Sequence, residues 1–153
     1  MSRTDFQPAD ASFAERVLKS FNKQGIMAHM GASMPVIEPG YCEIHLPFKA
    51  DLTQQHGFFH GGVIGMIADS AAGFAGYSLT GADAGVLTIE YKMNIVAPGD
   101  GELLIAEGTV IKPGRNVSVT KADVFAVKNG KRKLCATMLQ SLAVRTGIPD
   151  FLG

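Results

Sequence analysis

The chain has 153 residues, of which 46% are apolar and 18% charged, enough for one soluble domain with a real hydrophobic core. Lys and Arg together number 14, as do Asp and Glu together, so the formal net charge is zero. This balance indicates neither nucleic acid nor an anionic membrane as a partner. The N-terminal segment has no apolar signal region, and Cys42 and Cys135 lack the spacing of metal or redox sites. We therefore expect a reduced, cytoplasmic protein with one domain over 1–153 and a core over about 26–146.

The first third of the chain predicts one helix and a hairpin. Apolar residues recur at helical spacing over about 12–24, and Gly25 is placed to end this helix. Two short alternating segments, over 32–37 and 41–48, flank a Pro-Gly turn. We expect them to pair as antiparallel strands.

A long apolar stretch from Val63 to Leu79 contains a single charged residue, Asp69. No polar face exists at helical spacing, which predicts a helix over about 62–79 that is buried on all sides. A membrane span is the alternative, but the glycines, the central carboxylate and the lack of a second such segment argue against it. An ionised Asp in a core helix must be paired, hydrogen-bonded or neutralised. Asp69 is therefore either a functional group or a core carboxylate satisfied by local hydrogen bonds.

The remainder of the chain predicts four strands, because residues of high β-propensity alternate with turn signals such as Asn129-Gly130. The predicted strands cover 86–96, 102–111, 116–127 and 131–144. Tight turns between them predict antiparallel neighbours in chain order. One sheet face needs a cover, and the helix over 62–79 is the apolar element available. The sequence thus predicts an α+β fold in which an antiparallel sheet of five or six strands wraps around a central buried helix.

A spaced set of polar and glycine residues leads into this helix. A Gly lies three residues after a Gln, His-Gly-Gly begins three residues later, and an Asp lies nine residues after the His. These residues are Gln54, Gly57, His60, Gly61, Gly62 and Asp69. Over about 34–145, the motif and the order of elements resemble the hotdog fold and the family of small acyl-CoA thioesterases related to the phenylacetate-pathway (PaaI-like) enzyme. Thr88, ten residues before Pro98, matches a Ser or Thr that is common in that family. Many members have Asn in place of Gln54, and others combine Gln with Glu, so Gln54 with Asp69 mixes two patterns.

The resemblance implies an acyl-CoA thioesterase, and the residues suit that chemistry. Thioester hydrolysis needs a group that polarises the carbonyl and a carboxylate that attacks it or deprotonates water. Asp69 is the candidate base or nucleophile, and the Gly61 N–H at the helix start is the candidate oxyanion donor. Gln54 would orient the water. His60 either fixes the loop or donates to the thioester, and Thr88 is a strand residue or a helper of the water.

The sequence also offers candidates for residues that contact the coenzyme A and acyl parts of the substrate. Coenzyme A would bring phosphates, and two basic residues flank the turn Pro113-Gly114. Exposed basic residues at strand ends also serve simply to protect a sheet edge. The predicted substrate-binding set is Gly62, Thr88, Phe58, Phe59, Lys112 and Arg115, with Phe74 and Met66 as further candidates for the acyl pocket. His and Cys form no ligand set, so we expect no metal and no cofactor apart from the coenzyme A of the substrate.

The helix geometry predicts that two chains share each site. His60 and Asp69 are nine residues apart, which on a helix is about 13.5 Å of rise and about half a turn out of phase. Gly61 at the helix start and Asp69 of the same chain cannot easily contact one thioester together. Two chains related by a two-fold axis can, if one supplies Gly61 and the other supplies Asp69. We expect a homodimer, or a homotetramer built as a dimer of dimers. The alternatives to a thioesterase are a non-catalytic acyl-CoA-sensing module and an enoyl-thioester hydratase of the same fold.

Overall fold

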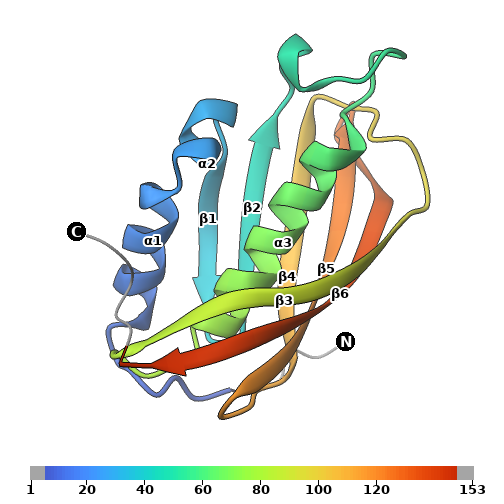
Figure 1. The fold of residues 1–153 in the computed structure, drawn as a ribbon. Helices are drawn as coiled ribbons and strands as arrows, with labels where there is room; N and C mark the ends of the chain where they lie inside the picture. Colours follow the sequence, from blue (N-terminus) through green and yellow to red (C-terminus); the bar gives the residue numbers. More distant parts are fainter. Residues whose placement is uncertain (1–5, 148–153) are drawn as a thin grey trace.

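The computed structural model describes residues 6–147, which form an antiparallel sheet wrapped around one long helix (Figure 1). The first five and last six residues of the predicted 1–153 domain lie outside the described part. The elements in chain order are α1 (Phe13–Lys23), α2 (Gly25–Met30), β1 (Ser33–Glu38), β2 (Tyr41–Pro47), a short 3-10 turn (Ala50–Leu52), α3 (Gly61–Tyr77), β3 (Ala84–Ile95), β4 (Leu103–Lys112), β5 (Val117–Lys128) and β6 (Lys131–Thr146). The predicted fold class is confirmed.

The strand order in the sheet is β1-β2-β4-β5-β6-β3, with every pair antiparallel. The predicted neighbours β4, β5 and β6 are confirmed, but the prediction that β3 lies beside β4 is wrong, since β3 pairs with β6 and β2 pairs with β4. The segment after β3 is a crossing and not a tight turn. Its Ala97 N–H donates to Cys135 O, and Glu102 N–H donates to Val127 O, so the chain passes across β6 and β5 before β4 begins. This crossing leaves β3 at one edge of the sheet.

Helix α3 lies on the inner face of the curved sheet, close to the range predicted for it (Figure 1). Gly108 of β4 permits a close approach, because a Cβ there would overlap the backbone of Ala71 in the helix. The prediction that this helix is buried on all sides is wrong. One face is only partly covered in the single chain, and Asp69 lies on it. The residues of this face that are half-buried or exposed are Gly61, Gly62, Val63, Met66, Asp69, Ser70 and Gly73.

The first helix and the hairpins β1–β2, β4–β5 and β5–β6 agree with the predictions, but one short helix was not predicted. Gly25 begins the short helix α2, which was not predicted because six residues are too few to show a helical period. The hairpin of β5 and β6 turns at Asn129 and Gly130, whose φ angles of 51° and 73° are the left-handed values of a type I′ turn. In the part of the chain that the structure describes, no helix is long and apolar enough to cross a membrane.

Candidate active site

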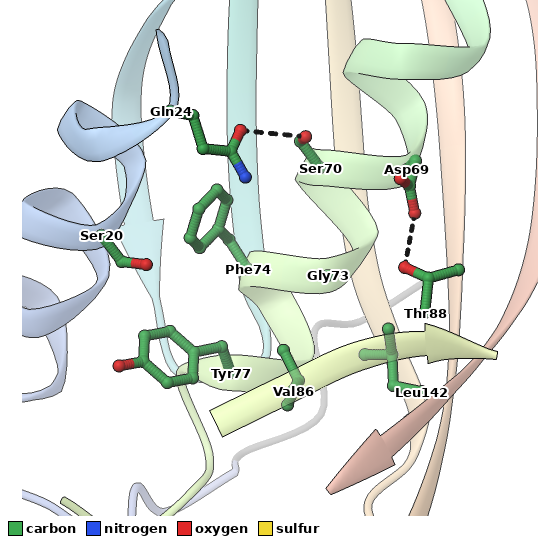
Figure 2. A pocket seen from close by; sticks show the side chains of 10 residues that line it. All are labelled: Ser20, Gln24, Asp69, Ser70, Gly73, Phe74, Tyr77, Val86, Thr88 and Leu142. Atoms are coloured by element: carbon green, nitrogen blue, oxygen red, sulfur yellow. Dashed lines mark hydrogen bonds between the residues drawn. The ribbon is translucent and has the colours of Figure 1, made fainter. Parts of the chain in front are cut away.

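Asp69 opens onto a cavity of about 200 Å³ between α1, α3 and the start of β3 (Figure 2). The cavity is lined by Ser20, Gln24, Asp69, Ser70, Gly73, Phe74, Tyr77, Val86, Thr88 and Leu142. Ser70 Oγ donates to Gln24 Oε1 over 3.3 Å and thereby links α3 to the residue that joins α1 and α2. Phe74, one of the predicted acyl-pocket residues, forms part of the apolar wall. The carboxylate therefore stands beside a space that a small acyl group can enter.

Two donors hold one oxygen of the Asp69 carboxylate. Thr88 Oγ1 donates to Asp69 Oδ1 over 2.7 Å, and Gln140 Nε2 donates to the same oxygen. Among the described residues, nothing donates to Asp69 Oδ2. The expectation that this carboxylate is hydrogen-bonded is confirmed, and the second oxygen remains available for chemistry.

Thr88 reaches Asp69 because β3 is bulged at this point. Thr88 pairs with Leu142 of β6, whereas Glu90 pairs with Ser141, so Ile89 is an extra residue between them. A bulge changes the direction in which neighbouring side chains point. The structure thus brings the predicted residues Thr88 and Asp69 together, although they lie on different elements.

One N–H group at the start of α3 has no acceptor among residues 6–147. His60 is the N-cap, and its Nδ1 accepts from the Gly62 N–H over 2.8 Å, so a neutral imidazole carries its proton on Nε2. This bond occupies the Gly62 N–H. No group in the described chain accepts from the Gly61 N–H, which leaves it as the free donor at the positive end of the helix dipole.

The loop before α3 brings Gln54 to the same end of the helix. Gln54 Oε1 accepts from the His56 N–H, and the Gln54 N–H donates to Phe58 O over 2.9 Å. The Nε2 group of Gln54 has no acceptor among the described residues. An open groove of about 500 Å³ collects the predicted residues of this end. It is lined by Gln54, His56, Phe58, Phe59, Gly61, Ile64, Ile95, Val96, Ala97, Pro98 and Gly99.

The structure therefore separates the predicted site into two half-sites within one chain. Gln54 and Gly61 line the groove at the start of α3, whereas Asp69 and Thr88 line the cavity further along it. Gly61 and Asp69 are eight residues apart, which corresponds to about 12 Å of rise along the helix. Both half-sites border β3, one at Thr88 and the other at Ile95.

The structure brings Lys112 and Arg115 to neither half-site. Arg115 lines a separate groove with Gly76 and Thr80 near the C-terminal end of α3, and Lys112 is exposed at the end of β4. Another basic cluster lies closer to the Gly61 groove. A groove of about 370 Å³ at the β5–β6 hairpin shares Phe58 and Pro98 with it and is lined by Phe58, Pro98, Asp100, Ala126, Lys128, Asn129, Lys131 and Lys133.

Both cysteines are free and buried. Burial raises the pKa of the Cys135 thiol to about 11, and burial together with the charge of Glu38 raises the pKa of the Cys42 thiol further. Both groups are therefore neutral thiols at pH 7 and poor nucleophiles.

We expect neither cysteine to react with the thiol reagent DTNB in the native protein, and both to react in guanidinium chloride. Rapid labelling of the native protein would contradict the buried assignment.

Gln140 is the residue of this site that the sequence did not predict. Its signal is present in β6, where the inward positions Ala136, Met138, Leu142 and Val144 are apolar and Gln140 is the one polar side chain among them. A polar residue at a buried strand position needs a hydrogen-bond partner. The alternation predicts such a partner, but it does not identify Asp69, which lies 71 residues away in sequence.

Comparison with known proteins shows the family and the fold of this chain. The sequence model of the thioesterase superfamily matches residues 56–133. A solved structure of a thioesterase family protein from Silicibacter pomeroyi is 39% identical, covers 88% of this chain and 99% of its own, and superposes with a TM-score of 0.87. A Haemophilus influenzae thioesterase (21% identical, covering 97% of each chain, TM-score 0.77) shares the fold. The E. coli PaaI protein from the phenylacetic acid degradation operon also shares it (17% identical, 89% of this chain and 95% of that one, TM-score 0.79).

Proposed function

This chain belongs to the thioesterase superfamily and is a thioester hydrolase, and we propose that its substrates are acyl or aryl thioesters of coenzyme A. The membership confirms the family that the spacing from Gln54 to Asp69 predicted, and the hotdog fold with it. Acyl-CoA substrates agree with the cytoplasmic location that we propose from the two free cysteines.

The observation that carries this proposal is the state of the Asp69 carboxylate. Thr88 and Gln140 hold its Oδ1, while Oδ2 has no partner among the described residues, and a cavity of about 200 Å³ adjoins it. A carboxylate with a purely structural role would be expected to use both oxygens in hydrogen bonds within the protein, whereas Oδ2 of the half-buried Asp69 is open to the cavity, where water or a substrate can reach it. Asp69 instead has the arrangement of a general base or a nucleophile.

The proposed reaction uses the two half-sites together. The Gly61 N–H donates to the thioester oxygen as negative charge develops there, and Gln54 Nε2 orients the water. Asp69 Oδ2 either takes the proton of the water that attacks the carbonyl carbon or attacks this carbon itself. The C–S bond breaks, and in the general-base route coenzyme A leaves as the thiol with the proton that Asp69 took from the water, while the acyl group leaves as the acid. In the nucleophilic route the thiolate leaves first, and water then hydrolyses the acyl anhydride on Asp69, which releases the acid and supplies the proton of the thiol. These steps draw on protein groups and water, so we propose that no further cofactor takes part.

We propose that each site is built at a homodimer interface along β3. Leu87, Ile89 and Tyr91 on this edge strand are 55%, 54% and 45% exposed in the single chain. An exposed apolar edge of this kind invites pairing with another strand. Antiparallel pairing of β3 with its copy across a two-fold axis would bring the Thr88 end of one strand beside the Ile95 end of the other. The Asp69 half-site of one subunit would then meet the Gly61 half-site of the other.

A dimer of dimers would cover further apolar surface. Val117 and Leu139, on β5 and β6, are 49% and 53% exposed and lie on the sheet face that points away from α3. Such side chains favour an interface over a free surface when they gather on one face. The homotetramer is therefore our proposed assembly.

Coenzyme A gives the substrate a negatively charged end, and the basic β5–β6 hairpin adjoins the Gly61 groove, since the two grooves share Phe58 and Pro98. Lys128 is paired with Asp100 over 2.7 Å, and Arg132 is paired with Glu107. No described carboxylate pairs with Lys131 or Lys133. We propose that these two lysines, in place of Lys112 and Arg115, contact the phosphates of coenzyme A.

Changing Lys131 and Lys133 to Ala together is expected to raise KM for an acyl-CoA on the order of tenfold and to leave kcat unchanged, since each exposed ion pair contributes up to about 1 kcal/mol. The same acyl group on N-acetylcysteamine lacks the phosphates, so its KM should not change. The control variant combines Lys112→Ala with Arg115→Ala and should behave as the wild type. Equal changes in KM for both thioesters, or a tenfold rise in the control, would contradict this assignment.

Thiol release measured over a panel of acyl-CoA and aryl-CoA substrates tests the proposed function. We expect stoichiometric release of coenzyme A from at least one member. An enoyl-CoA that is consumed without release of thiol would identify the hydratase of the same fold instead. Binding of acyl-CoA without turnover of any panel member would favour the sensing module.

A further inference from the structure

Gln140 is a fully buried amide, with 0% of its surface exposed, in the strand that faces Asp69. A buried amide must form hydrogen bonds to offset the loss of water. The side chain forms them with Thr120 on one side and with Asp69 and Thr88 on the other. It therefore links the interior of the sheet to the carboxylate that faces the cavity.

The neighbours of Gln140 determine which way its amide points. Thr120 Oγ1, itself fully buried, donates to Gln140 Oε1 over 2.9 Å, and the two residues are paired directly across β5 and β6. The opposite orientation would place the amide oxygen against the carboxylate of Asp69, which is acceptor-only when ionised. The Nε2 group must therefore face Asp69, where it donates to Oδ1 and reaches the backbone oxygen at 3.3 Å.

The consequence for Asp69 is that both donors occupy the same oxygen. Thr88 and Gln140 each donate to Oδ1, so rotation of the carboxylate would break two bonds to the ionised group at once. Thr88 lies on the exposed edge strand, whereas Gln140 lies in the packed interior. The Gln140 side chain is therefore more tightly restrained than that of Thr88.

We propose that Gln140 is a positioning residue for the hydrolysis: it holds the Asp69 carboxylate with Oδ2 toward the cavity, and Thr120 holds Gln140 in the orientation that this requires. The inference rests on the proposed role of Asp69. Gln140 does not itself line the cavity, so it acts through Asp69 and not on the substrate. A preorganised carboxylate loses no time or free energy to rotation when the thioester arrives.

The test compares steady-state kinetics of Gln140→Met with the wild type on an acyl-CoA that the wild type hydrolyses. Met is unbranched and of similar length, so it fills the space while removing the donor. We expect kcat to fall about 10- to 100-fold, in line with the loss of a hydrogen bond to a charged group. KM should stay within about twofold, since no substrate contact is removed. A kcat within about twofold of wild type in the folded protein would overturn the proposal.

Two variants of Thr120 test the same proposal if Gln140→Met fails to fold. Thr120→Val removes the hydroxyl with little change of shape, and Thr120→Ser retains it. We expect Thr120→Val to lose several-fold in kcat and Thr120→Ser to keep most of it. Equal kcat values for the two variants would contradict the role given to Gln140.

Ser118→Ala serves as the control for a purely structural effect. Ser118 is also a buried polar residue of β5, but its Oγ accepts from the Gly114 N–H, away from Asp69. We expect this variant to lose stability without any change in kcat. If kcat falls in Ser118→Ala as much as in Gln140→Met, the effect belongs to the sheet and the proposal fails. Absence of turnover in the wild type itself would instead refute the proposed function.

Discussion

Asp69→Asn is expected to lower the rate of thiol release by a factor on the order of 100 or more, while the protein remains folded. Asn keeps an acceptor oxygen that Thr88 and Gln140 can both bind, so the hydrogen bonds that hold the side chain survive. What the change removes is the ionised oxygen toward the cavity, which is the base or nucleophile of the proposed reaction. Steady-state kinetics on an acyl-CoA that the wild type hydrolyses measures the effect.

The control for Asp69→Asn is a measurement of whether the variant is folded. Circular dichroism and the thermal midpoint of the variant should match those of the wild type, because the side chain is almost isosteric and only half-buried. Activity within tenfold of wild type in a well-folded variant would assign the chemistry to another group.

Mixing two inactive variants is expected to restore activity if each site is shared between subunits. Asp69→Asn lacks the carboxylate, and Gly61→Pro lacks the N–H that would bind the thioester oxygen. In a mixed dimer, one site contains both lesions and the other contains neither. Random co-refolding of equal amounts should give about a quarter of wild-type activity, because half of the dimers are mixed and each has one intact site.

The local structure suits Gly61→Pro for this experiment. Proline is accepted at the first position of a helix, and His60 already has the extended conformation, φ −62° and ψ 140°, that a residue before proline adopts. A Cβ at this position would meet the tip of Ile95 at 3.0 Å, which is a flexible side chain. The variant should therefore fold and form dimers.

Each parent is first checked alone for folding, by circular dichroism, and for dimer formation, by light scattering. Native mass spectrometry then measures the fraction of mixed dimers, and the recovered activity should rise in proportion to it. Mixed dimers that form in the expected amount and show no activity would refute the shared site, since each chain would then use only its own residues.

Much of the candidate site could be predicted because its residues are close together in sequence. The run from Gln54 to Asp69 combines a loop with glycines, a helix start and an apolar helix, and each of these has a local pattern. Thr88 was predicted by its family spacing alone. Gln140 and the lysines of the β5–β6 hairpin were not assigned to the site, because their proximity to it arises only when the sheet curves around α3.

The sequence by itself determined the elements of this protein apart from the short helix α2. Alternating and helical periods, together with turn residues such as Asn129 and Gly130, depend on neighbours a few residues apart, and they predicted the strands, the long helix and the motif. Only the tertiary structure decided that β3 pairs with β6, that one face of α3 is left partly open, and that Gln140 meets Asp69. The reason is that strand partners depend on the path of the connection over 96–102, and no local pattern distinguishes a crossing from a hairpin there.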